Sequence, residues 1–181
     1  YYPVFLDLRG RQVLIVGGGK VAERKIAGLL RSGARLTAMA PVAGSKIRKW
    51  SREGKVAWEK RRLATARFLK KANLSLVLCA TDDQALNARV AGACSRAGTL
   101  CNVVDDLSLS TFIAPSVARK GDLILAVSTG GASPLLAREI RRQLENDLGD
   151  GYGRLLALLK ALRPRVRQAL ATPGLRKRYF Q

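Results

Sequence analysis

Short apolar runs alternate with amphipathic segments over the first 104 residues of the chain. Residues 13–16 form a continuous apolar run, which is typical of a strand buried on both faces of a sheet. In residues 21–32 the apolar positions recur at the spacing of one helix face, and Gly33 follows as the expected C-terminal cap. The alternation then repeats, with strands expected at 35–39, 56–58, 74–80 and 101–104, and helices through Ile47 and Trp50 to near Gly54 and over 83–97.

This rhythm predicts a parallel sheet with helices on both faces, because parallel strands need right-handed crossover connections. It stops near Asp106. Beyond that point we expect a strand over 123–127 and then a helix with Ser133 as its N-cap and Pro134 as its first residue. That helix has an apolar face made of Leu135, Leu136, Ile140 and Leu144.

Three regions follow from this pattern. They are an α/β doubly wound sheet domain over residues 1–106, a small α+β segment over about 107–148, and a helical C-terminal region over 149–181. Residues 112–115 and the helix from Ser133 lie outside a self-sufficient sheet, so their apolar faces need a partner surface. We therefore expect a symmetric homodimer, the commonest solution.

A glycine-rich loop stands between the first predicted strand and the first predicted helix. Residues 17–22 read GGGKVA and fit the pattern G-x-G-x-x-A. Gly17 permits the tight turn, Gly19 lets a pyrophosphate approach the backbone, and Ala22 allows close packing of helix on strand. The anion would lie on the helix N-terminus, where free N–H groups and the helix dipole favour it. Since strand and helix flank the loop, we expect a Rossmann-type dinucleotide-binding domain rather than a merely structural turn.

The motif by itself does not separate NAD from NADP. The acid that usually binds the adenosine ribose is missing, because the second strand ends in MAPV at residues 39–42. Backbone groups of Pro41 and Val42 are the expected contacts there. The second expected cofactor edge is the end of the fourth strand, at Thr81 and Asp82, although either residue could instead cap the helix that follows.

Two acids, Asp105 and Asp106, follow the predicted fifth strand at the same edge of the sheet. The chain contains no histidine, which excludes Ser-His-Asp and Cys-His catalysis, so a carboxylate is the natural candidate for proton transfer. Strand alternation should send the two side chains to opposite sides. We therefore expect Asp105, the closer to the strand, to be catalytic; the alternative is a pair of solvated turn residues.

The composition narrows the class of protein further. Lys plus Arg total 33 against 13 acids, a formal charge of +20, which favours anionic partners; the alternative is a basic surface that serves only solubility. The three cysteines lack a CxxC spacing, as expected of reduced thiols, and without histidine no metal site is expected. No apolar run reaches the length of a membrane span, and the N-terminus does not resemble a signal peptide. We expect a cytoplasmic protein that does not contact membranes.

Five segments resemble the precorrin-2 dehydrogenase/sirohydrochlorin ferrochelatase family, the N-terminal module of sirohaem synthase. The resemblance covers about residues 1–175. The most specific segment, which generic dinucleotide-binding domains lack, runs from FIAPS at 112–116 through STGGASP at 128–134. The others are PVFLDL at 3–8, VGGGKVAERK at 16–25, ATDD at 80–83 and CNVVD at 101–105.

The resemblance implies an enzyme that oxidises precorrin-2, an anionic tetrapyrrole, to sirohydrochlorin with NAD. Many members then insert ferrous iron to give sirohaem. It implies a homodimer in which segment 107–148 swaps across the interface, and some members continue into a fused methyltransferase. The implied residues are an essential aspartate at Asp105, NAD contacts at Lys20, Val21, Pro41 and Val42, and substrate contacts at Ser116, Ser133 and Thr129, where many relatives have serine.

Two other functions stay open at this point. One is an NAD(P)-sensing regulatory module without catalysis, but a bare sensor needs no capped extension after the sheet. The other is nucleic-acid binding, since basic stretches at 60–62 and 176–178 would suit phosphates. No helix-turn-helix, RNP or finger motif accompanies these stretches, so the sequence favours the polyanionic tetrapyrrole as partner.

Overall fold

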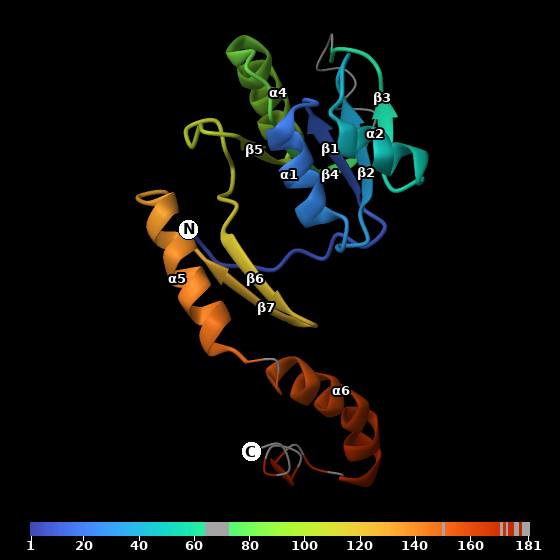
Figure 1. Cartoon of the computed structure of the whole chain (residues 1–181), viewed down its shortest axis with the longest axis vertical. Helices are drawn as coiled ribbons and strands as arrows, with labels where there is room; N and C mark the ends of the chain where they lie inside the picture. The colour runs from blue at the N-terminus through green and yellow to red at the C-terminus, as the bar shows by residue number, and fades with distance from the viewer. Residues whose placement is uncertain (64–72, 150, 171, 173, 176–177, 179–181) are drawn as a thin grey trace. The chain divides into compact units, whose positions relative to one another are not determined.

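The structure is a computed structural model that describes residues 1–63, 73–149, 151–170, 172, 174, 175 and 178. Part of the basic stretch predicted at 176–178 lies outside the described residues, as does the very end of the predicted helical region. The chain forms two compact units, Tyr1–Ile113 and Ala114–Gln181. Figure 1 shows the first unit as the sheet with its helices and the second as a hairpin followed by helices.

The first unit is built on a parallel sheet of five strands, β1 (Gln12–Val16), β2 (Arg35–Met39), β3 (Ala57–Glu59), β4 (Leu74–Cys79) and β5 (Leu100–Val103). Their order across the sheet is β3-β2-β1-β4-β5, and all neighbours pair in parallel. The predicted doubly wound, Rossmann-type sheet is therefore confirmed. The strand order reverses beside β1, and ligands of such sheets bind beyond the strand ends at this point.

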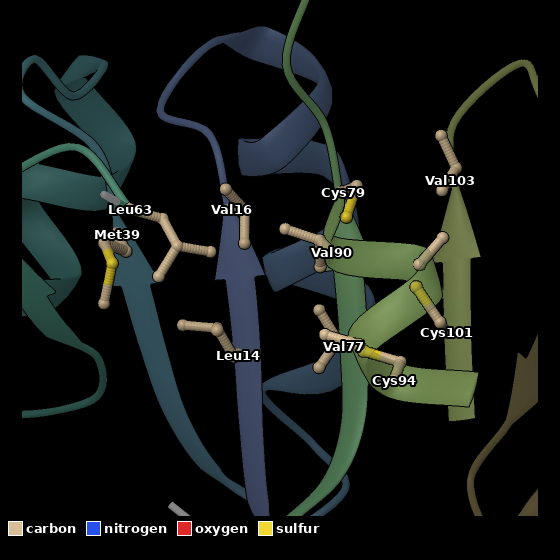
Figure 2. Close-up of a cluster of buried hydrophobic side chains, with 12 residues drawn as sticks. Leu14, Val16, Met39, Leu63, Val77, Cys79, Val90, Cys94, Cys101 and Val103 are labelled. Atoms are coloured by element: carbon tan, nitrogen blue, oxygen red, sulfur yellow. The ribbon is translucent and has the colours of Figure 1, made fainter. Parts of the chain in front are cut away.

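Apolar side chains bury both faces of the sheet, which explains the continuous apolar run in β1. Val13 and Ile15 belong to the cluster that α1 (Lys20–Leu29) and α2 (Ser45–Arg52) cover. Leu14 and Val16 point to the other face, where α4 (Gln84–Ala97) contributes Val90. Figure 2 shows this second cluster, in which side chains of neighbouring strands meet those of α4.

The three cysteines, Cys79, Cys94 and Cys101, lie within that second cluster as free, fully buried thiols. A hydrogen bond with Cys79 raises the pKa of the Cys101 thiol to about 12, and burial acts in the same direction. A hydrogen bond with Cys101, together with burial, raises the pKa of the Cys94 thiol as well. Because the thiolate is the reactive form, these two cysteines act as small apolar core residues.

The end of α1 differs from the prediction. The helix ends at Leu29 with Leu30 as its C-cap, and Gly33 lies beyond it in a turn, at φ +71°. Ser32 is the reason, because its N–H and its hydroxyl both donate to the Leu29 carbonyl, at 2.9 and 2.6 Å. Gly33 instead accepts the Gly10 N–H at 2.8 Å and so joins the turn to the segment before β1.

The first unit ends at Ile113, later than the expected boundary at Asp106. The reason is a return of the chain along β5. The Thr111 N–H donates to the Cys101 carbonyl at 2.8 Å, and the Thr111 hydroxyl accepts the Cys101 N–H at 2.8 Å. Ser110 Oγ accepts the Val103 N–H at 2.9 Å. Phe112 packs against the apolar cluster of the sheet. Of the segment 112–115, for which the sequence predicts a partner surface, Phe112 is thus partly buried within its own unit.

The second unit starts with a hairpin of β6 (Ser116–Lys120) and β7 (Leu123–Val127), followed by α5 (Pro134–Asp147) and α6 (Gly151–Ala169). The start of α5 is as predicted, because Ser133 Oγ accepts the Leu136 N–H at 3.2 Å and Pro134 is the first helical residue. On α6, Lys160 forms an exposed ion pair with Asp122 of the hairpin turn at 2.6 Å. Among the described residues, no helix has both the length and the apolar character to cross a membrane.

Candidate functional site

The glycine loop runs between β1 and α1 in contact with the backbone that follows two other strands. Gly17 has φ +125°, and a Cβ on it would overlap the carbonyl of Ala80, just after β4. A Cβ on Gly18 would overlap the carbonyl oxygen of Val42, after β2. At Gly19, by contrast, a Cβ would meet no atom within 4 Å. The loop is therefore packed on its first two residues and open on the third. The sequence pattern singled out Gly17 and Gly19 and missed Gly18.

The N-terminus of α1 carries no side-chain cap. Gly19 is its N-cap residue, and the Gly19 carbonyl accepts the Glu23 N–H at 3.0 Å. Among the described residues, no side chain accepts a hydrogen bond from the N–H groups of Lys20 or Val21. Helix α2 also has a glycine N-cap, Gly44, but the Glu23 carboxylate accepts its Lys46 N–H at 2.8 Å, and at α4 the Asp83 carboxylate accepts the Leu86 N–H at 2.9 Å. The first turn of α1 therefore offers free donors to an anion above an open glycine, which fits a dinucleotide pyrophosphate.

A carboxylate from α1 lies at the start of α2, in the part of the chain that follows β2 and has no acid of its own. Glu23 Oε1 accepts the Lys46 N–H in the first turn of α2 at 2.8 Å, and a Cβ on Gly44 would overlap this carboxylate. The Gly44 N–H donates to the Gly18 carbonyl at 2.8 Å, which joins this segment to the glycine loop. Pro41 and Val42 lie exposed in the same segment. Glu23 was missed because no local pattern pairs it with α2.

The end of β4 lies beside the glycine loop, since the Ala80 N–H donates to the Val16 carbonyl at 2.7 Å. Neither Thr81 nor Asp82 caps α4, because that role belongs to Asp83. The Thr81 hydroxyl donates to Asn87 Oδ1 at 2.7 Å, and the Asn87 amide returns a hydrogen bond to the Thr81 carbonyl at 2.9 Å. Asp82 is exposed. The capping alternative is thus wrong for both residues, and their contact with a cofactor stays a prediction.

Asp105 and Asp106 lie in a turn, because β5 ends at Val103. Strand alternation is therefore not what separates them. Asp106 Oδ1 accepts the Ser108 hydroxyl at 2.6 Å and the Leu109 N–H at 3.1 Å, and the hydrogen bond from Ser108 lowers the pKa of this carboxyl. Asp105 is exposed and has a φ of +62°, a left-handed conformation that aspartate tolerates better than most residues. Asp106 thus stabilises the turn on which Asp105 is carried.

The three predicted substrate contacts lie in the second unit, at one end of its hairpin. Ser116 pairs with Val127 across the strands, and Thr129 follows two residues later. The Thr129 hydroxyl accepts the Ser133 N–H at 3.1 Å and donates to the Ser133 carbonyl at 3.0 Å. Since Ser133 caps α5, Thr129 and Ser133 both organise the start of that helix. A role in substrate binding remains a prediction for all three.

Comparison with known proteins agrees with this geometry. A family model described as NAD(P)-binding matches residues 4–116, which places the chain among dinucleotide-binding α/β proteins. The models "Sirohaem biosynthesis protein central" and "Sirohaem synthase dimerisation region" match residues 120–147 and 151–181. The solved structure titled "SirC, precorrin-2 dehydrogenase" superposes with a TM-score of 0.82 at 31% identity, covering 98% of this chain and 86% of that one. The chain belongs to the family of the sirohaem synthase N-terminal module.

Similar curated proteins are sirohaem synthases. The one from Nitrosospira multiformis is 40% identical over 185 residues, which cover all of this chain and 39% of that protein. The one from Methylococcus capsulatus is 42% identical over 183 residues, covering all of this chain and 38% of that protein. The chain thus spans about two fifths of the length of these relatives.

The glycine loop yields a prediction that separates cofactor binding from folding. Gly19→Asp places a carboxylate in the open space where a pyrophosphate must lie, so we expect NAD affinity to be lost while the protein stays folded. Gly18→Ala should instead destabilise the protein by about 1–3 kcal/mol, because its Cβ overlaps the Val42 carbonyl. Calorimetric titration with NAD and urea unfolding measure the two effects. A folded Gly19→Asp variant with unchanged NAD affinity would contradict the assignment.

Proposed function

We propose that this chain is an NAD-dependent precorrin-2 dehydrogenase that forms sirohydrochlorin. The observation that carries the proposal is the common location of three features at one edge of the parallel sheet. These are the open Gly19, the uncapped N-terminus of α1, and the Asp105 turn after β5. The match to the precorrin-2 dehydrogenase structure extends over nearly the whole chain and supports the same activity.

In this proposal the glycine loop holds the cofactor. Gly17 and Gly19 form the turn, and the backbone N–H groups of Lys20 and Val21 bind the pyrophosphate. The adenosine ribose lies against Pro41 and Val42, and Thr81 and Asp82 border the cofactor from the end of β4. Bound NAD supplies the hydride acceptor. The protein contributes orientation of both partners and a group that takes up the proton.

Asp105 is that group in our proposal. Oxidation of precorrin-2 removes a hydride and a proton, and with no histidine in the chain a carboxylate is suited to accept the proton. We propose that the same carboxylate takes up pyrrole N–H protons when ferrous iron, a second substrate, enters sirohydrochlorin. The formal charge of +20 attracts a tetrapyrrole rich in carboxylates, and Ser116, Thr129 and Ser133 are its proposed contacts in the second unit.

Replacing Asp105 tests this assignment. Asp105→Asn keeps the size of the side chain but removes the base, so we expect the rate of sirohydrochlorin formation to fall about 10²–10⁴-fold with NAD affinity preserved. Asp106→Asn is the matched control, because an amide oxygen can still accept the hydrogen bonds of Ser108 and Leu109. The absorbance of sirohydrochlorin gives the rate.

Three outcomes of that assay are informative. If Asp105→Asn turned over precorrin-2 at near the wild-type rate, the proton acceptor would have to be a substrate carboxylate or water. Loss of iron insertion alone would assign Asp105 to the chelatase step only. A wild-type protein that binds NAD but forms no sirohydrochlorin would be a sensor, and the dehydrogenase proposal would fail.

We further propose that the cofactor is NAD rather than NADP. A carboxylate beside the ribose disfavours a 2′-phosphate through like-charge repulsion and can accept a hydrogen bond from the 2′-hydroxyl. We assign this carboxylate to Glu23 of α1, since its side chain contacts the start of α2, which is joined through Gly44 to the glycine loop. The carboxylate of Glu59, the residue that pairs with Met39 across β2 and β3, is engaged by Arg61 at 2.6 Å.

The Glu23→Gln variant tests the cofactor preference. Glutamine keeps an oxygen acceptor for the Lys46 N–H but removes the charge, so the affinity for NADP relative to NAD should rise about tenfold. Glu53→Gln is the control, because Glu53 lies after α2 and pairs with Lys49 and Lys55. Binding titrations with both cofactors measure the ratio. If Glu23→Gln left the ratio of NADP affinity to NAD affinity unchanged, Glu23 would have no role in the choice between the two cofactors.

A homodimer completes the proposal. Only Ala137 of α5 is buried among the described residues, while Leu135 and Leu136 are 73% and 51% exposed. An apolar helix face of this kind needs a partner surface, and the match to a dimerisation region at residues 151–181 supports a second copy as the partner.

Sedimentation equilibrium tests the dimer. We expect a stable dimer at micromolar concentration, and Leu136→Asp should weaken it at least about tenfold, because the charge loses its water in the interface. Arg138→Asp places the same carboxylate on another face of α5 and serves as the control. A wild-type protein that sediments as a monomer would rule out the homodimer.

A further inference from the structure

Lys25 is a partly buried cation that connects α1 to the end of β5. Its Nζ donates to Asn102 Oδ1 at 3.5 Å, across 77 residues of sequence. Most other lysines and arginines of α1 and α2 lie exposed on the protein surface, whereas Lys25 lies between a helix and a strand of the sheet. A lysine in such a place is desolvated, so its ammonium group needs compensating polar contacts.

The orientation of the Asn102 amide is defined by its other contacts. Asn102 is 6% exposed, and its Nδ2 donates to the Phe112 carbonyl at 3.1 Å and to Ser110 Oγ at 3.4 Å. Since a carbonyl can only accept, the amide nitrogen must face Phe112, and Oδ1 therefore faces Lys25.

The same contacts reach the turn that carries Asp105. The Ser110 hydroxyl donates to the Asp106 carbonyl at 2.6 Å and accepts the Val103 N–H at 2.9 Å, on the two sides of Asp105 in the sequence. A chain of hydrogen bonds thus runs from Lys25 through Asn102 and Ser110 to the backbone of the turn. Asp105 also acts directly on Lys25 through its charge.

We propose that Lys25 is a positioning residue of the dehydrogenase site, whose ammonium group holds the Asn102 amide and, through Asn102 and Ser110, the turn that carries Asp105 at the cofactor edge of the sheet. This inference rests on the proposed function. The ammonium form is the active one, because only a protonated lysine attracts Asp105 and has all its N–H donors. Lys25 does not exchange a proton with the substrate.

The charges around Lys25 predict how its protonation responds to pH and to the removal of a neighbouring charge. Burial, followed by repulsion from exposed Arg24, lowers the pKa of Lys25, and attraction to Asp105 raises it. Arg24 and Asp105 are the charged groups that act on Lys25 among the described residues. As pH rises through this lowered pKa the ammonium is lost, so activity should fall on an alkaline limb below the usual range of lysine.

The experiment is the pH dependence of kcat/KM for sirohydrochlorin formation. In Lys25→Arg the alkaline limb should disappear from the accessible range, because a guanidinium stays charged, and activity at neutral pH should be retained. Lys25→Met should lower kcat by up to about 100-fold at all pH values, with NAD affinity unchanged. Arg24→Met, the matched control on the same helix, should keep the activity and move the limb to higher pH.

A second measurement does not depend on activity. Reductive ¹³C-methylation and NMR titration follow the Lys25 ammonium itself, and Asp105→Asn should move its titration to lower pH because the attraction is lost. The inference would be overturned if the alkaline limb of the pH profile persisted in Lys25→Arg. It would also be overturned if Asp105→Asn left the pH of the Lys25 titration unchanged. A wild-type protein without turnover would instead overturn the proposed function while the NMR result still reports on Lys25.

Discussion

The close contact of the glycine loop with its neighbours is the constraint on which the site depends. Gly17 lies against the carbonyl of Ala80 and Gly18 against that of Val42, so the ends of β1, β2 and β4 meet at one place. Side chains on these two glycines would push the strand ends apart. The crowded glycines are the first two of the loop, whereas the space beside Gly19, at the first turn of α1, is free of other atoms. The packing of the sheet and the binding surface for a pyrophosphate are therefore one feature.

Hydrogen bonds to backbone N–H groups fix several polar side chains, including two, Ser133 and Glu23, that also have a proposed role toward substrate or cofactor. Asp83, Ser133 and Asp106 each satisfy backbone N–H groups at a helix start or a turn. Glu23 does the same for α2 from another helix. Such groups are bound by local hydrogen bonds, and moving them would leave backbone donors without partners. Asp105 is exposed on a turn that its neighbour stabilises, which suits a group that must meet a substrate.

The two units differ in how far they complete their own cores. The sheet has apolar clusters on both faces, and even the segment through Phe112 packs back onto it. The helix α5 instead has leucines on its surface, and the described part of α6 buries only Val166. The sheet unit therefore completes its own core, whereas the exposed leucines of α5 leave an apolar face that the proposed homodimer would cover.

Local pattern was enough to predict all five strands of the sheet, the start of α5 and the glycine loop between β1 and α1. These features depend on periodicity, caps and turns that act within a few residues. Tertiary structure alone decided that Glu23 meets the start of α2, that Lys25 meets Asn102, and that the chain returns along β5. Contacts between residues 23 and 46, or 25 and 102, arise only when the sheet has assembled. No periodic signal encodes them, because they join elements that are distant in sequence.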